Sequence, residues 1–127
     1  MKKDIIRTAN APEPIGPYSQ AVEFDGTLYC SGQIPVNPST GEIPETVEEQ
    51  THQVLANLRA VIEEAGGELK DVVKTTIFLT DLNTFASVNA IYGEYFDEAT
   101  APARSTVQVA ALPKGVFIEI DAIAKLN

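Results

Sequence analysis

Residues 72–80 read Val-Val-Lys-Thr-Thr-Ile-Phe-Leu-Thr and lie in the middle of the chain. β-Branched and aromatic side chains fit a pleated, half-buried surface, so this stretch predicts a β-strand. The segments before and after it have the patterns of amphipathic helices. A strand between two helices favours a domain in which helices pack against a sheet.

The first of these helices is predicted over residues 46–65. Thr46 and Glu49 form a capping-box pattern at its start, and Gly66-Gly67 ends it. Its apolar side chains recur at helical spacing on one face. They are Val47, Val54, Leu55, Leu58, Val61, Ile62 and Ala65.

The second helix is predicted over residues 84–97, with Asp81 or Asn83 as its cap. Its apolar side chains also share one face, which we expect to lie in the core. They are Phe85, Val88, Tyr92 and Phe96.

Four further strands are predicted over residues 19–24, 27–31, 105–111 and 116–124. Asp25-Gly26 joins the first pair as a tight hairpin, because both positions tolerate a positive φ. The order strand–strand–helix–strand–helix–strand–strand predicts one α+β domain over residues 1–127. We expect a single mixed sheet with both helices on one face, so that the other face meets water or another subunit.

The composition is that of a globular domain, with 44% hydrophobic and 21% charged residues among the 127. No apolar stretch approaches the ~18–20 residues that span a bilayer, and the N-terminus does not read as a secretory signal. The single cysteine excludes an intrachain disulfide, which fits a cytoplasmic protein. The net charge of −9 and the scattered basic residues argue against nucleic-acid binding.

Arg104 lies in Ala101-Pro102-Ala103-Arg104-Ser105-Thr106, at the entrance of a predicted strand. The planar fork of a guanidinium fits a carboxylate or a phosphate bidentately. We therefore predict a site for a small anion at Arg104. An ordinary structural ion pair with Asp121 or Glu98 is the alternative interpretation.

Alternation of side chains along the last two strands predicts which residues share the face that the helices leave bare. If the turn between these strands has four residues, Gln108 faces Glu119, and Arg104 is roughly 13 Å further along. A small ligand would fit between Arg104 and Glu119, and the mixed polar and apolar face suits an interface in a closed homo-oligomer. The residues expected on this face are Arg104, Thr106, Gln108, Phe117, Glu119, Asp121 and Ile123.

Four segments carry a family resemblance along almost the whole chain. They are Ile15-Gly16-Pro17-Tyr18-Ser19-Gln20-Ala21, Ser31-Gly32-Gln33-Ile34-Pro35, Pro102-Ala103-Arg104-Ser105 and Ile118-Glu119-Ile120. In this order they resemble the RidA/YjgF/YER057c/UK114 family of imine deaminases. The resemblance implies a homotrimer of chorismate-mutase-like subunits, in which the sheets line a central barrel and three ligand clefts lie between subunits.

The resemblance also implies an activity, the hydrolysis of 2-imino acids to 2-oxo acids and ammonia. The implied substrates are 2-iminobutanoate and 2-iminopropanoate, which arise from enamines such as 2-aminoacrylate. Arg104 is implied to bind the substrate carboxylate and Glu119 to position the attacking water. The other implied substrate-binding residues are Tyr18, Ser31, Gly32, Asn89 and Thr106.

Thr106 departs from the family pattern, in which many members have cysteine at this position. Water can attack a protonated imine carbon directly, so we expect activity without a thiol nucleophile. We do not expect Cys30 to replace that thiol.

Two other functions remain open at this point. A non-catalytic trimer could use Arg104 to sense a keto or amino acid and regulate a partner. RNA cleavage, reported for some relatives, should need a basic track or an aromatic stacking platform, and the sequence indicates neither. The lone His52 is expected to be a surface or packing residue, and no spacing suggests a metal site or a cofactor.

Overall fold

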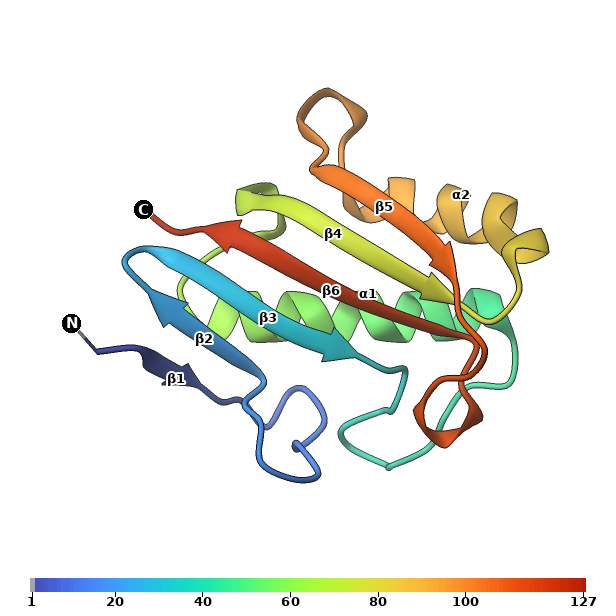
Figure 1. The fold of residues 1–127 in the computed structure, drawn as a ribbon, viewed down its shortest axis with the longest axis horizontal. Coiled ribbons are helices and arrows are strands. Elements are labelled where there is room, and N and C mark those ends of the chain that lie inside the picture. Colours follow the sequence, from blue (N-terminus) through green and yellow to red (C-terminus); the bar gives the residue numbers. More distant parts are fainter. Residues whose placement is uncertain (1) are drawn as a thin grey trace.

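A six-stranded mixed sheet forms one layer of the domain, and two helices form the other (Figure 1). The computed structural model describes residues 2–127. The strand order across the sheet is β1-β2-β3-β6-β4-β5, and the helices are α1 (Val47–Glu64) and α2 (Phe85–Tyr95). The strands are β1 (Asp4–Ile6), β2 (Ala21–Phe24), β3 (Thr27–Gln33), β4 (Val72–Leu79), β5 (Ala103–Gln108) and β6 (Ile118–Lys125). The predicted fold class, a single mixed sheet with both helices on one face, is confirmed.

The ends of α1 follow the signals in the sequence. The Thr46 hydroxyl accepts a hydrogen bond from the backbone N–H of Glu49 at 3.1 Å, which caps the first turn. At the other end Gly66 adopts a φ of 89°, and the N–H of Gly67 donates to the carbonyl of Ile62. Only glycine adopts this left-handed conformation without strain, so the helix stops there.

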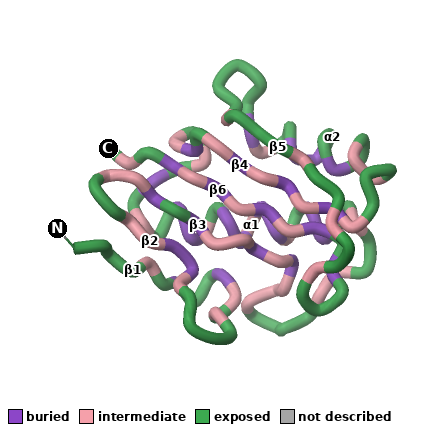
Figure 2. The backbone as a smooth tube through the Cα atoms, in the orientation of Figure 1, coloured by how far each residue is buried: buried purple, intermediate pink, exposed green. Residues whose placement is uncertain are grey.

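The core lies between the helices and the sheet face that they cover. The apolar stripe of α1 supplies five fully buried side chains to it, and alternate residues of β4 and β6 supply most of the rest. Figure 2 shows the same alternation as purple and pink segments along the central strands. Every second residue of β6 is buried and apolar, as expected for a strand in the middle of a sheet.

The predicted pairing of the last two strands is wrong. β6 lies antiparallel between β3 and β4, whereas β5 is an edge strand that pairs only with β4, in parallel. Gln108 therefore does not face Glu119; Gln108 pairs with Leu79, and Glu119 pairs with Phe78. Residues 109–117 carry the chain from the edge of the sheet back to its centre, past β4.

β1 was not predicted. This strand has three residues, too few to show an alternating pattern, and it forms only by pairing with β2. One row of apolar residues on the bare face then runs from β1 to β6, through Ile5, Val22, Tyr29 and Ile123. Ile5 and Tyr29 are each at least half exposed. Within residues 2–127, neither helix is long and apolar enough to cross a membrane.

Candidate active site

Arg104 lies near the start of β5 with its side chain on the helix side of the sheet. One of its guanidinium N–H groups donates to the amide oxygen of Asn89 on α2, at 2.8 Å. The guanidinium carbon also lies 4.9 Å from the ring centre of Tyr92 and 5.3 Å from that of Phe85. These are cation–π distances, so two aromatic faces and one amide hold the guanidinium.

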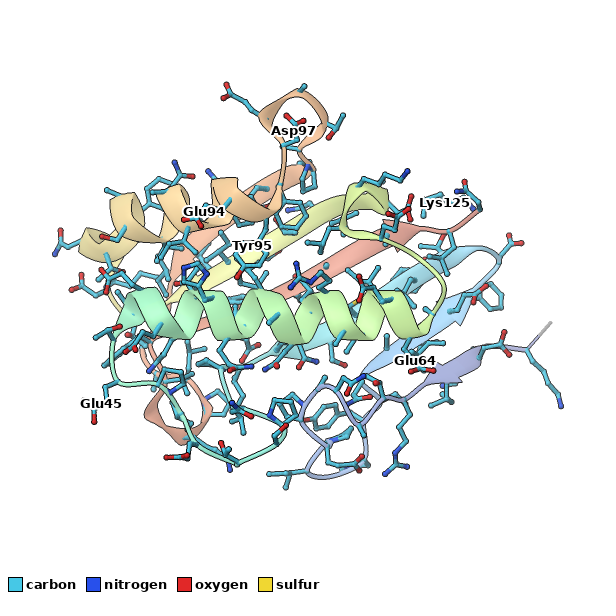
Figure 3. All side chains as sticks on the ribbon, turned by 180° about the vertical axis from the view of Figure 1, so that it is seen from behind. Glu45, Glu64, Glu94, Tyr95, Asp97 and Lys125 are labelled. Carbon is cyan, nitrogen blue, oxygen red and sulfur yellow. The ribbon has the colours of Figure 1, made fainter. Side chains whose placement is uncertain are left out.

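A cavity of about 490 Å³ opens beside this guanidinium; we call it the arginine cavity. Its wall comes from α2, from the start of β5 and from the loop between them, which projects beyond α2 where Asp97 is labelled in Figure 3. The lining residues are Asn89, Tyr92, Gly93, Phe96, Glu98, Ala101, Pro102 and Arg104.

The alternative of a structural ion pair at Arg104 has no support within residues 2–127. The ion pairs in this part of the chain are Arg7–Glu13 and Lys70–Glu68. Glu98 lines the arginine cavity without pairing with Arg104, and Asp121 lies on the other face of the sheet. Among the residues that the structure describes, none therefore neutralises the positive charge of Arg104.

Glu119 lies on the bare face of β6, half buried. Its carboxylate rests against the backbone of Gly32, so closely that a Cβ atom added to Gly32 would overlap a carboxylate oxygen. Burial raises the pKa of Glu119, and repulsion from the Asp121 carboxylate raises it further. A carboxyl group with a raised pKa is suited to accept a proton and give it back near neutral pH.

The β-bulge of β3 presents Gly32 to this carboxylate. The register between β3 and β6 shifts between Cys30 and Gln33, and Ser31 and Gly32 occupy the irregular stretch. The Ser31 hydroxyl donates to the carbonyl of Ser19, and its N–H donates to the carbonyl of Gln20. These bonds fasten the bulge to the loop that carries Tyr18.

Tyr18 and Gly32 line a second cavity, of about 330 Å³, which we call the loop cavity. Tyr18 remains 53% exposed although it lines this cavity. Ser31 fastens the bulge to the loop that carries Tyr18, and Gly32 lies against the carboxylate of Glu119. We call Tyr18, Ser31, Gly32 and Glu119 the glutamate group.

The predicted site residues thus fall into two separate sets. Arg104 pairs with Thr75, a fully buried residue under the helices, whereas Glu119 pairs with Phe78 on the bare face. Thr106 lies on the same side of the sheet as Arg104, and its cross-strand partner is Ile77. The expectation that Arg104, Thr106 and Gln108 share a face with Glu119 is therefore wrong. Alternation fixed which residues of β5 go together, but the parallel pairing with β4 turned that set toward α2.

Several residues that shape these sets were not predicted to do so. Phe85 and Tyr92 were interpreted only as core residues, although their rings also face Arg104. Asn57 is buried on the apolar stripe of α1 and donates to the carbonyls of Ile34 and Val36, both in the wall of the loop cavity. The signal for this role of Asn57 was a polar residue at a position where the helical stripe otherwise has apolar side chains.

Gln20 is a second buried amide with this kind of role. It is 1% exposed, accepts from the N–H of Thr8, and donates to the carbonyls of Thr8, Ala11 and Pro12. These bonds hold residues 8–12 against the start of β2. Pro12 and Gln20 both line the loop cavity, so the amide fixes one of its walls.

Cys30 and His52 lie outside both sets. Burial raises the pKa of the Cys30 thiol to about 12, so the thiolate needed for a nucleophile does not form near neutral pH. His52 is exposed on α1, and a hydrogen bond of 2.8 Å joins its Nδ1 to the hydroxyl of Tyr95, which Figure 3 shows between the two helices. Among residues 2–127, no three His, Cys, Asp or Glu side chains are grouped to hold a metal ion.

Comparison with known proteins finds relatives over nearly the full length. The family model for endoribonuclease L-PSP matches residues 8–126. A 2-iminobutanoate/2-iminopropanoate deaminase of Escherichia coli is 56% identical over 121 residues, which cover 94% of this chain and 94% of that protein.

Solved structures agree with the fold over the same length. A protein of the conserved Rid family from Yersinia pestis superposes with a TM-score of 0.96 at 54% identity, covering 98% of this chain and all of that chain. The structure of Escherichia coli TdcF with bound serine superposes with a TM-score of 0.93 at 49% identity, covering 98% of this chain and 99% of that one.

Proposed function

The chain belongs to the endoribonuclease L-PSP family of RidA/YjgF proteins, and we propose that it hydrolyses reactive 2-imino acids to 2-oxo acids and ammonia. The observation that carries this proposal is the guanidinium of Arg104, held by neutral groups at the wall of the arginine cavity. Within residues 2–127 no acidic side chain pairs with this guanidinium, and such a charge suits the carboxylate of a small organic acid. The name of the Escherichia coli relative supports 2-iminobutanoate and 2-iminopropanoate as substrates.

The complete site, in this proposal, lies between two subunits of a homotrimer. Arg104 and Glu119 lie on opposite faces of one sheet, so a single chain does not direct both at one ligand. The arginine cavity of one subunit would face the glutamate group of the next. Two features of the isolated chain support such an assembly: the unpaired outer edge of β5 and the exposed apolar residues of the bare face.

The reaction then follows from the two sets of residues. Arg104 binds the substrate carboxylate. This contact holds the electrophilic carbon of the imine, whose nitrogen is protonated, close to a water molecule at Glu119. The water oxygen bonds to the imine carbon while Glu119 takes its proton, which gives a carbinolamine. Glu119 returns this proton to the nitrogen, the C–N bond breaks, and the departing ammonia takes the hydroxyl proton as the carbonyl forms. The products are a 2-oxo acid and ammonium. The mechanism needs no thiol nucleophile, so it tolerates threonine at position 106 and does not use Cys30.

The experiment is a coupled assay in which a threonine dehydratase generates the imine. We expect the wild-type protein to speed the release of ammonia and 2-oxobutanoate above the rate in water, and Arg104→Ala to lose nearly all of this acceleration. Arg59→Ala is the matched control, because Arg59 is an exposed arginine of α1 outside both cavities. If the wild-type protein binds the 2-oxo acid but does not speed ammonia release, it is a non-catalytic binding protein instead.

A further inference from the structure

Asn89, which the family resemblance implies to be a substrate-binding residue, is in contact with Arg104. Its amide oxygen accepts a hydrogen bond from the guanidinium at 2.8 Å and is thereby occupied by the arginine. An aspartate at this position would have nearly the same shape but would form a charge-assisted ion pair with the arginine. The neutral amide orients the guanidinium without neutralising it.

The aromatic side of the contact has the same property. Tyr92 lies under the guanidinium, with its ring centre 4.9 Å from the guanidinium carbon. A hydrogen bond of 2.7 Å joins its hydroxyl to that of Thr75, which is fully buried. Burial raises the pKa of Tyr92 despite the opposing effects of Thr75 and Arg104, so the phenol stays uncharged near neutral pH.

Thr75 connects the two ends of this arrangement. It is the direct cross-strand partner of Arg104 in the parallel pair of β4 and β5. The backbone of Arg104 is thus fixed by the strand pairing, and its side chain rests on a ring that the same threonine holds in place. Long, flexible arginine side chains lose considerable entropy when they are ordered, and such a support reduces the loss on binding.

We propose that Asn89 and Tyr92 are positioning residues that hold Arg104 through uncharged contacts, so that its full positive charge remains available for the carboxylate of a ligand. This rests on the proposed function for the identity of the substrate. It differs from the role that the family resemblance implies for Asn89, since the amide acts through the arginine and not on the substrate.

The test compares two variants that each add one negative charge to α2. Asn89→Asp places the charge beside Arg104, whereas Ser87→Asp places it on an exposed residue two positions earlier, on the opposite side of the helix. Binding of 2-oxobutanoate, a stable 2-oxo acid, is measured by calorimetry on the intact oligomer. We expect Asn89→Asp to weaken binding by about tenfold or more, because its carboxylate competes for the fork, and Ser87→Asp to bind as the wild type does.

Tyr92 is tested through the mobility of the arginine itself. The ¹⁵N–¹H signal of the Arg104 Nε group reports how firmly the guanidinium is held. Tyr92→Leu should broaden or remove this signal and weaken binding of 2-oxobutanoate, whereas Tyr92→Phe, which keeps the ring and loses only the bond to Thr75, should restore most of both. Circular dichroism and sedimentation check that each variant is folded and assembled.

Separate outcomes count against the positioning role and against the deaminase. Equal binding by Asn89→Asp and the wild type, or equal losses for Asn89→Asp and Ser87→Asp, would overturn the positioning role even if the wild type deaminates imines. Failure of the wild type to bind the 2-oxo acid at all would overturn it too. Binding that depends on Arg104 and Asn89 as described, without any deamination, would remove the proposed activity and leave the positioning role standing.

Discussion

At the scale of single residues, the carboxylate of Glu119 lies where only a glycine leaves room for it. The space above Gly32 is filled by the glutamate side chain, and a methyl group there would overlap a carboxylate oxygen. Gly32 does not have a positive φ, so its backbone conformation is open to other residues. The glycine is needed for the position of Glu119 more than for the turn.

This geometry predicts the effect of Gly32→Ala. The new methyl group should displace the Glu119 carboxylate and lower kcat by about 100-fold, as expected when a reacting group moves by roughly 1 Å. Thermal unfolding should change little by comparison, because the backbone can stay in place. Steady-state kinetics with the coupled assay measure the effect, and a kcat close to the wild-type value would show that Glu119 is not in the reaction.

The raised pKa of Glu119 predicts how stability depends on pH. A carboxyl group whose pKa is higher in the folded state than in the unfolded state stabilises the fold fully below its unfolded pKa, and this contribution is lost as the pH rises through the folded pKa. Glu119→Gln cannot ionise and avoids that loss. We expect the variant to unfold at a higher temperature than the wild type at about pH 7, and the difference to vanish near pH 4.

Calorimetric unfolding of the two proteins across this range makes the comparison. A variant that is less stable than the wild type at neutral pH would mean that the charged carboxylate has a stabilising partner in the assembled protein. In either case the activity of Glu119→Gln should fall mainly in kcat, since the amide cannot accept the proton from water.

At the scale of elements, β5 illustrates what a strand pattern does and does not determine. Arg104, Thr106 and Gln108 do share one face, as alternation requires. The sequence places Arg104, Thr106 and Gln108 on the bare face, so the alternate residue Val107 is expected to face the helices. The structure has the reverse arrangement, and Val107 is 40% exposed on the bare face. An edge strand beside an aromatic platform can turn its polar set inward, because the rings of Tyr92 and Phe85 hold Arg104 there.

The loops at the other end of the sheet depend on buried amides. Gln20 replaces the hydrogen bonds that residues 8–12 would otherwise make with water. Gln20→Met keeps the length of the side chain but leaves these buried backbone groups without their partner. We expect it to lower the free energy of unfolding by about 2 kcal/mol or more. Gln108→Met is the control, because Gln108 is exposed and its side-chain oxygen accepts a hydrogen bond only from the backbone N–H of Leu82 within residues 2–127.

Denaturant unfolding measures both variants. We also expect Gln20→Met to raise KM, because the loop that carries Tyr18 and one wall of the loop cavity would no longer be fixed. Equal stability of the two variants would mean that water replaces the amide at no cost.

At the scale of the whole molecule, the separation of Arg104 from Glu119 makes the assembly part of the chemistry. If each site takes its arginine from one subunit and its glutamate from the next, two inactive variants should complement each other. Subunits with Arg104→Ala that are unfolded and reassembled in equal amounts with Glu119→Gln subunits should regain roughly a quarter of the wild-type sites, as random mixing around a three-fold axis gives.

The control for this mixing is each variant reassembled alone, which should stay inactive. Sedimentation gives the oligomeric state and the coupled assay gives the regained activity. No regained activity in a trimer that demonstrably contains both variants would place both groups of each site in one subunit, contrary to their positions on the sheet.

The sequence by itself determined the features that depend on neighbours along the chain. The helix over residues 46–65, its threonine cap and glycine stop, the hairpin at Asp25-Gly26 and the apolar stripes all follow from side-chain type and local spacing. The family motifs also singled out Arg104 and Gly32, although not how either one is held.

Only the tertiary structure decided which strands are neighbours, and therefore which side chains meet. Arg104 lies beside Thr75 and Glu119 lies against Gly32, partners that are far apart in the sequence. Pairing between such distant segments depends on which strand buries more apolar surface and on the crossover that a helix imposes, and neither is set locally. That is why the motifs identified the residues of the site while the fold alone divided them between the two faces of the sheet.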